Sequence, residues 1–166
     1  MKALRQFDTS AAAIIARLPK SLHRPFDILG YAMPPSTWAL ALAAYSLAAY
    51  DGSLLAPGVF ALFFVPGATI SKFLFKRHRP PTIYAGNMRI KSYSFPSSHA
   101  YSAALGAGFF ASAAFASQLV LLGWALICLA FVIGVSRVFL GAHYPSDVIG
   151  GWLLGGLVVA GILLWA

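Results

Sequence analysis

Long apolar stretches separated by short polar connections make up most of this chain. They lie at about residues 32–50, 53–71, 100–118, 119–135 and 148–166. Each is close to the about 20 residues that cross the hydrocarbon layer of a bilayer as an α-helix. Prolines in or beside the first two stretches are compatible with helix, because neighbouring membrane helices satisfy the freed backbone groups. The pattern predicts an all-α fold, a multi-pass transmembrane helical bundle with five spanning helices.

The first 31 residues follow a different pattern. Apolar side chains recur there at helical spacing, at Phe7, Ala11, Ile14, Ile15 and Leu18. Arg5, Arg17 and Lys20 fall on other faces, and Asp8 is placed to cap a helix. Segment 1–31 is therefore predicted to be an amphipathic helix that lies in the membrane interface. If it crossed the bilayer instead, the bundle would have six spans.

The composition agrees with a membrane protein. Of the 166 residues, 60% are hydrophobic and 10% are charged, and the mean hydropathy is +0.78, whereas soluble domains contain about 25% charged residues. The net charge of +8 does not indicate nucleic-acid binding, because so apolar a chain lacks a broad polar face. Anionic lipid of the bilayer is the expected partner, and no obligate protein partner is indicated. The chain reads as one integral-membrane domain, 1–166, with no internal repeat.

Two small residue types suggest packing roles. Cys128 is the single cysteine, so neither an intramolecular disulfide nor a thiol metal cluster can form, and it is predicted to pack in the core. Gly151 and Gly155 are four residues apart in the last apolar stretch, a pattern that lets helices approach closely. The glycines indicate either packing within the chain or a dimer seam.

Charge is distributed unevenly between the two sides of the predicted bundle. When the predicted spans cross the bilayer in chain order, segment 1–31 and the connections 76–96 and 137–147 lie on one side of the membrane. All twelve Lys and Arg residues lie on that side. The opposite side carries only Asp51 as a charged residue. Positively charged connections face the cytoplasm in most membrane proteins. This predicts that the polar side is the cytoplasmic side of a bacterial inner membrane.

The first polar patch follows the second apolar stretch. Lys72 and Arg79 are seven residues apart, close to two helical turns, so both could project from one helix face and converge on an anion. The alternative is ordinary snorkelling of basic residues at the interface, beside Lys76 and Arg77.

The second patch, Pro96-Ser97-Ser98-His99, opens the third apolar stretch. Ser97 is a natural helix cap, and the free amides of the first turn, together with the helix dipole, would form a cradle for an anion. A capped helix with a surface histidine is the simpler alternative.

The third patch runs from Ser136-Arg137 to His143 and Asp147. Asp147 is predicted to lie in the first turn of the last helix, with His143 just before it. The carboxylate there can serve as a helix cap. It can also accept a hydrogen bond from one ring nitrogen of His143 and leave the other nitrogen as a nucleophile.

Taken together, the three patches supply the parts of a phosphoryl-transfer site. They contain a nucleophile, an orienting carboxylate, a second histidine to protonate the leaving oxygen, and cations for the phosphoryl oxygens. One carboxylate is too few for a magnesium or two-metal cage. We therefore expect no metal and no cofactor.

These residues resemble the motifs of the type 2 phosphatidic acid phosphatase superfamily, which includes lipid phosphate phosphatases and vanadium haloperoxidases. Its pattern, K-x6-R-P, P-S-G-H and S-R-x5-H-x3-D, is matched across residues 72–147. The resemblance implies that His143 forms a phosphohistidine, Asp147 orients it and His99 is the general acid. It further implies phosphate binding by Lys72, Arg79, Ser97, Ser98 and Arg137. Ser98 replaces the usual glycine, which is harmless if it lies in the first helical turn.

The expected function is therefore dephosphorylation of a membrane lipid phosphate, such as phosphatidate, phosphatidylglycerophosphate or a polyprenyl phosphate derivative. An undecaprenyl-diphosphate phosphatase is the nearest alternative. Two alternatives of other classes are a non-catalytic membrane scaffold or transporter and a vanadium haloperoxidase.

Overall fold

A computed structural model of the protein describes residues 2–49, 70–86 and 92–165. All regular structure within these ranges is helical, which confirms the all-α prediction. Residues 70–75 are helical too. The helices are α1 (Lys2–Ile15), a 3-10 turn (Lys20–Leu22), α2 (His23–Ala32), α3 (Pro35–Ala49), α5 (Ile83–Gly86), α6 (Ser98–Ala116), α7 (Val120–Phe139) and α8 (Pro145–Trp165).

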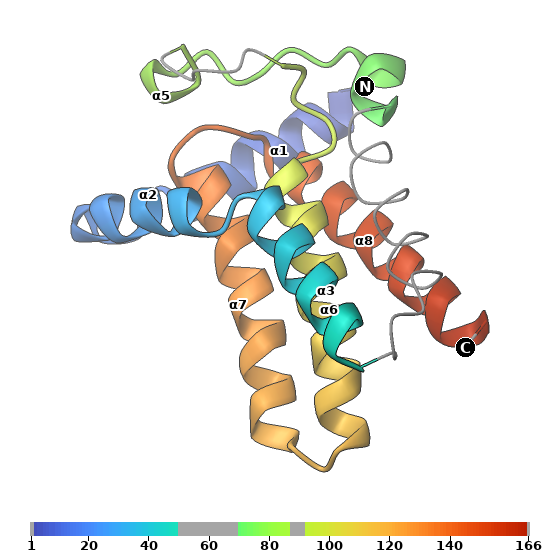
Figure 1. Ribbon diagram of the computed structural model, residues 1–166. Coiled ribbons are helices and arrows are strands. Elements are labelled where there is room, and N and C mark those ends of the chain that lie inside the picture. Colours follow the sequence, from blue (N-terminus) through green and yellow to red (C-terminus); the bar gives the residue numbers. More distant parts are fainter. Residues whose placement is uncertain (1, 50–69, 87–91, 166) are drawn as a thin grey trace.

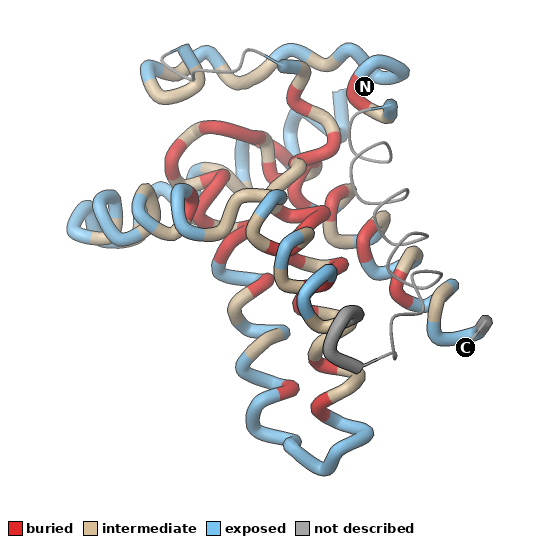
Figure 2. Tube along the Cα trace, in the orientation of Figure 1, coloured by how far each residue is buried: buried red, intermediate tan, exposed pale blue. Residues whose placement is uncertain are grey.

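Helix α6 is the centre of the bundle, because it packs against α7, α8 and α3. The end of α7 lies close to the start of α8, and the two helices diverge from there, while α1 and α2 lie across the end of the bundle where α8 begins (Figure 1). Buried residues gather at that same end, and the far ends of α6 and α7 are largely exposed (Figure 2). The bundle is therefore most tightly built where the polar motifs lie.

Two glycines of α8 set the close approach of α8 to α6. A Cβ on Gly151 would lie 2.8 Å from the carbonyl oxygen of Ser97, and one on Gly155 would lie 2.6 Å from that of Tyr101. Both distances are shorter than real side-chain contacts allow. The glycines thus serve packing within the chain, and they fix the start of α8 against the start of α6.

Two described helices are long and apolar enough to cross a membrane, Val120–Phe139 and Pro145–Leu164. Large apolar side chains on their surfaces are exposed, among them Leu121, Trp124 and Leu164, as expected of helices that face lipid. Helix α6 nearly coincides with the predicted span 100–118. The predicted span 53–71 falls almost wholly outside the described residues. The count of five spans thus remains a prediction.

The predicted burial of Cys128 was wrong, because Cys128 is exposed on α7. A membrane helix can be as apolar on its lipid-facing side as on its core-facing side. Hydropathy along α7 therefore could not tell which face holds a given residue.

The amphipathic segment forms two helices, α1 and α2, joined by the 3-10 turn. Ala12 and Ile15 of α1 pack against Val138 and Val148 of the bundle. Contrary to the prediction, Asp8 does not cap the helix that carries it: it lies within α1 and is only 3% exposed. The helical spacing predicted helix here correctly, while the placement of the segment in the membrane interface stays a prediction. The burial of Asp8 depends on what α1 packs against, which the spacing does not reveal.

Candidate active site

The three polar patches converge at the end of the bundle where α6 and α8 begin. The backbone N–H of Ser97 donates to the carbonyl oxygen of Asp147 at 3.0 Å, which joins the second patch directly to the third. His99 interacts electrostatically with Arg137, His143 and Arg79. Residues from all three motifs therefore share one site.

His143 lies in the short loop between α7 and α8 and is 3% exposed. Its Nε2 lies 3.0 Å from Nη1 of Arg79. A guanidinium can only donate, so Nε2 is the acceptor and the ring proton of the neutral imidazole is on Nδ1. Burial lowers the pKa of His143 to about 4; Asp147 opposes this, and the charges of Arg79 and Lys72 reinforce it. The side chain is therefore a neutral imidazole at neutral pH, as a nucleophile must be.

The other ring nitrogen of His143 faces two oxygen atoms. Its Nδ1 lies 3.4 Å from Oγ of Ser94 and 3.7 Å from Oδ2 of Asp147. The second distance is too long for a hydrogen bond. Ser94 Oγ donates to Oδ2 of Asp147 at 2.5 Å, so this hydroxyl connects the carboxylate to the imidazole.

Asp147 is fully buried in the first turn of α8. Its Oδ2 also accepts from the backbone N–H of Tyr144 at 2.9 Å, in the manner of the third helical residue of a capping box. Its Oδ1 accepts from Nη1 of Arg77 at 2.7 Å. Asp147 thus caps its own helix, as the first alternative predicted. It also lies beside His143, but the direct hydrogen bond of the second alternative is not formed, and the Ser94 hydroxyl connects the two side chains instead.

Lys72 and Arg79 converge, but not by the predicted route. The helix that carries Lys72 ends at residue 75, and Lys76 has a positive φ of 45°, so the two residues do not share a helix face. Pro80 explains part of the break, because the residue before a proline is pushed out of the helical region. The prediction of one helix face was wrong, while the prediction that the two cations meet is confirmed.

Both cations are held by backbone oxygen atoms. Nζ of Lys72 donates to the carbonyl of Tyr93 at 2.8 Å. Arg79 donates from Nε to the carbonyl of Ser92 at 2.8 Å and from Nη1 to that of Ala142 at 2.9 Å. Lys72 follows the predicted span 53–71. Burial lowers the pKa of Lys72 to about 8; the charge of Arg79 also lowers it, and the charge of Asp147 opposes the shift.

Helix α2 covers the remaining motif residues. Nη2 of Arg137 donates to the carbonyl of Phe26 at 3.1 Å, and Nε2 of His99 lies 3.3 Å from the carbonyl oxygen of Gly30. A Cβ on Gly30 would lie 2.1 Å from Nη2 of Arg137, so only glycine leaves room for the guanidinium.

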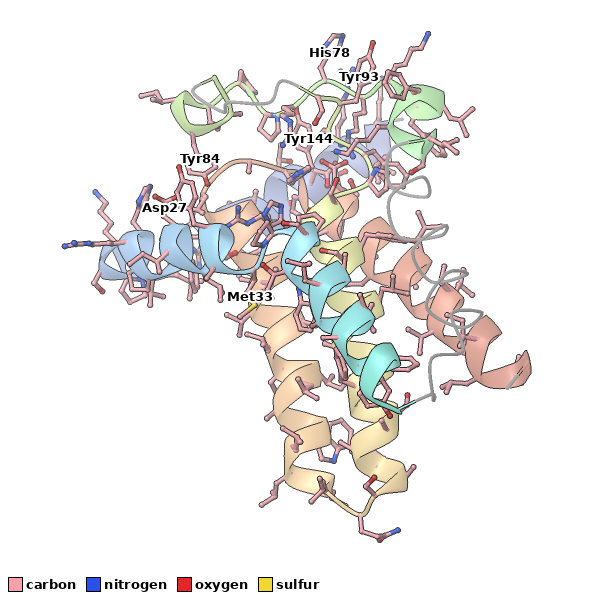
Figure 3. All side chains as sticks on the ribbon, in the orientation of Figure 1. Asp27, Met33, His78, Tyr84, Tyr93 and Tyr144 are labelled. Atoms are coloured by element: carbon pink, nitrogen blue, oxygen red, sulfur yellow. The ribbon has the colours of Figure 1, made fainter. Side chains whose placement is uncertain are left out.

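One hydrogen bond ties α2 to the connection that carries α5. The Tyr84 hydroxyl donates to Asp27 of α2 at 3.1 Å, and these two side chains point toward one another between α2 and α5 (Figure 3). Helix α2 is thereby held over the site from a second direction.

Ser97 caps α6 as predicted. Its Oγ accepts from the backbone N–H of Ala100 at 3.4 Å. Ser98 is the first residue of α6, which confirms that this position tolerates serine. The backbone amides of Ser98 and His99 point out of the helix start, where a helix has no acceptors of its own.

The comparisons agree with this geometry. The family model described as the PAP2 superfamily matches residues 50–166. The chain belongs to the PAP2 superfamily. This confirms the resemblance drawn from the three motifs.

Several curated relatives match parts of this PAP2 chain. A lipid A 1-phosphatase of Rhizobium etli is 49% identical over 63 residues, which cover 38% of this chain and 25% of the relative. An undecaprenyl-diphosphatase of Sulfolobus acidocaldarius is 36% identical over 96 residues, 52% of this chain and 42% of the relative. The bacitracin transport permease protein BcrC of Bacillus licheniformis is 54% identical over 33 residues, 20% of this chain and 16% of the relative. The chain thus spans less than half the length of these relatives.

The fold has a solved counterpart. The transmembrane PAP2 type phosphatidylglycerolphosphate phosphatase of Bacillus subtilis superposes with a TM-score of 0.82 at 22% identity, covering 99% of this chain and 87% of that one. Together with the apolar helices, this fold indicates that the PAP2 chain is an integral membrane protein.

Three site residues of this PAP2 chain escaped the sequence analysis. Arg77 was read as snorkelling at the interface, yet it pairs with Asp8 and Asp147. Ser94 carried no signal beyond its place two residues before Pro96. Asp8 did carry a signal in the sequence, because it is among only four acidic residues in the chain.

Within the described residues, no group of three or more His, Cys, Asp or Glu side chains could hold a metal ion. The polar atoms of the site are mostly donors and cations. That donor set fits an anion.

Proposed function

We propose that this protein is a membrane-embedded, metal-independent phosphatase that removes phosphate from a lipid phosphate through a phosphohistidine intermediate. The observation that carries the proposal is the environment of His143. Its Nε2 is an acceptor 3.0 Å from Arg79, and Lys72 acts on it electrostatically. A lone pair surrounded by cations suits attack on an anionic phosphoryl group.

The proposed reaction has two steps. The lone pair of His143 Nε2 forms a bond to phosphorus while the P–O bond to the lipid breaks, and the leaving oxygen takes a proton from His99, which must enter this step as the imidazolium. Water then attacks phosphorus, the N–P bond breaks, its electron pair returns to Nε2, and one water proton goes to His99. The products are the lipid alcohol and inorganic phosphate.

The phosphoryl oxygens would be held by fixed donors. Lys72, Arg79 and Arg137 supply charge, and the amides at the start of α6 supply helix-dipole hydrogen bonds. Ser97 contributes by holding that helix start in place. These groups would stabilise the charge that develops in the transition state. In other phosphatases a divalent metal ion has this role.

A lipid substrate is supported by the place of the site and by the relatives. The site lies at the end of a bundle that contains two helices long and apolar enough to cross a membrane, and in a bilayer that end would lie near the lipid headgroups. The relatives are named for lipid A and undecaprenyl diphosphate. We therefore propose lipid monophosphates and polyprenyl diphosphates as the substrate class.

The test is phosphate release by the protein purified in detergent, with EDTA present, across phosphatidate, phosphatidylglycerophosphate and a polyprenyl diphosphate. We expect release from at least one of these, inhibition by vanadate, and loss of release in His143→Ala. Turnover retained by His143→Ala would refute the phosphohistidine mechanism. No release by the folded wild-type protein would favour a scaffold or transporter, and halide oxidation with bound vanadate would favour a haloperoxidase.

We propose that the site faces the cytoplasm, because the connections on its side carry the basic residues. A cysteine introduced at Ser21 in a Cys128→Ser background tests this. In intact cells it should resist a membrane-impermeant thiol reagent; labelling without lysis would reverse the orientation.

A further inference from the structure

A single guanidinium bridges two buried carboxylates behind the proposed nucleophile. Arg77 donates from Nη2 to Oδ2 of Asp8 at 2.6 Å and from Nη1 to Oδ1 of Asp147 at 2.7 Å. The Asp8 and Asp147 side chains are 3% and 0% exposed. Both carboxylates therefore form an ion pair with the same cation.

Asp8 also binds the start of α8 directly. Its Oδ1 accepts from the backbone N–H of Ser146 at 2.9 Å, and its Oδ2 accepts from the Ser146 hydroxyl at 3.0 Å. This is a helix cap supplied by a residue 138 positions away. The Arg77 guanidinium lies 4.2 Å from the centre of the Tyr144 ring. Helix α1, Arg77 and the first turn of α8 thus form one connected unit.

The two oxygens of Asp147 have separate partners. Oδ1 accepts a hydrogen bond from Arg77. Oδ2 accepts hydrogen bonds from the Ser94 hydroxyl and the Tyr144 backbone N–H, and it faces His143. Rotation of the carboxylate would cost the Arg77 contact. The orientation of Oδ2 toward the imidazole is therefore set by the group that holds Oδ1.

We infer that Arg77 and Asp8 are positioning residues for the proposed reaction: Arg77 fixes the carboxylate of Asp147 beside His143, and Asp8 fixes Arg77. The inference rests on the proposed function, because its readout is turnover. If Asp8 is a positioning residue, α1 has a role in the active site in addition to any role in membrane attachment.

The chemistry of the bridge requires an arginine. A planar guanidinium presents paired donors in a fixed fork, so it can hold two carboxylates in fixed directions, whereas an ammonium group cannot. Without Arg77, both buried carboxylates would lose the cation that is hydrogen-bonded to them. Without Asp8, Arg77 keeps its charge but loses one of the two contacts that fix its plane.

The test compares Arg77→Gln, Arg77→Lys, Asp8→Asn and the double variant Asp8→Asn with Arg77→Gln, in the full-length protein in detergent. We expect kcat for a lipid phosphate to fall about 100-fold in Arg77→Gln, as misplacement of a reacting group does, and less in Asp8→Asn and Arg77→Lys. KM should change little, because neither residue is proposed to touch phosphate. The double variant should be no slower than Arg77→Gln, because asparagine at position 8 keeps an oxygen for the Ser146 amide and the remaining effect of Asp8 acts through Arg77.

The pH profile separates positioning from loss of structure. The groups facing Asp147 are His143, Ser94, the Tyr144 amide and Arg77, and Lys72 and Arg79 interact with it electrostatically. Removing a paired cation makes a carboxylate easier to protonate. Loss of the Arg77 charge likewise favours protonation of the neighbouring His143, so the acid limb of kcat in Arg77→Gln should move to higher pH.

Two neighbours serve as matched controls. Lys76→Gln removes the exposed cation next to Arg77, and Thr9→Val changes an exposed residue next to Asp8 whose hydroxyl bonds only carbonyls of α1. Both should keep wild-type turnover. If Arg77→Gln does not accumulate as folded protein, Asp8→Asn and Arg77→Lys carry the test.

The outcomes distinguish the two proposals. Folded Arg77 and Asp8 variants with wild-type kcat, an additive double variant, or an unchanged acid limb would overturn the positioning inference while leaving His143→Ala inactive. Turnover in His143→Ala would instead overturn the proposed function.

Discussion

Nη1 of Arg79 lies 3.0 Å from Nε2 of His143. The contact occupies the nitrogen proposed as nucleophile, so an incoming phosphoryl group must take the place of the imidazole as the acceptor for this donor. The same Arg79 is held by the carbonyls of Ser92 and Ala142, which keep the guanidinium in place during that exchange.

Replacing Arg79 should damage catalysis severely. We expect Arg79→Gln to lower kcat about 100- to 1000-fold, the usual cost of removing one donor that stabilises transition-state charge. Phosphate release under saturating lipid phosphate measures this. Arg17→Gln, which removes an exposed cation after α1, should have no effect; an Arg79→Gln enzyme within threefold of wild type would remove Arg79 from the mechanism.

Activity should persist to unusually low pH. His143 has its pKa lowered by burial to about 4 from the ordinary 6.5, so the ring stays neutral between these values and protonates only below about pH 4. The acid limb of kcat/KM should therefore lie near pH 4 instead of near pH 6.5. A half-maximal rate near pH 6.5, measured with a substrate whose own titration is known, would contradict this.

Activity should decline on the alkaline side because of Lys72. Burial lowers the pKa of Lys72 to about 8, so the ammonium loses its charge, and its attraction for phosphate, as the pH rises through that value. KM should increase above about pH 8 in the wild type. Lys72→Arg stays charged and should move that increase to higher pH; identical alkaline limbs in the two proteins would exclude Lys72 as their source.

The Ser94 hydroxyl should matter although it lies outside the three motifs. Its Oγ donates to Asp147 at 2.5 Å and lies 3.4 Å from Nδ1 of His143. Ser94→Ala leaves a buried carboxylate one donor short, which should lower the free energy of unfolding by about 1–3 kcal/mol and kcat by up to about 100-fold. Thermal unfolding and turnover measure both effects.

Ser112→Ala is the control for Ser94→Ala, since the Ser112 hydroxyl bonds only the Gly108 carbonyl of its own helix. It should leave turnover unchanged. Equal losses in the two variants would mean that the Ser94 effect is not specific to the site.

The close contact of α8 with α6 should tolerate no added methyl group. Gly151→Ala would place a Cβ 2.8 Å from the carbonyl oxygen of Ser97, so the start of α8 must shift, at a cost of about 1–3 kcal/mol of stability and with loss of turnover. Gly156→Ala is the matched control, because nothing lies within 4 Å of its Cβ. Unfolding in detergent should separate the two variants, and equal stabilities would refute the packing argument.

The amino-acid sequence by itself determined the helical class, the grouping of the polar patches at one end of the bundle, and the residues of the three motifs. These follow from local rules. Apolar length predicts membrane helices, serine and aspartate mark helix starts, and short spacing brings His143 to within one turn of Asp147. Helix starts at Ser98 and Pro145 agree with those expectations.

Only the tertiary structure decided which other residues complete the site and which faces are covered. Arg77 meets Asp8 across 69 positions, and Asp8 meets Ser146 across 138. Such contacts depend on how α1 docks on the bundle, which no local pattern encodes. The sequence did not predict the exposure of Cys128 either, because in a membrane helix the core-facing and lipid-facing surfaces are equally apolar.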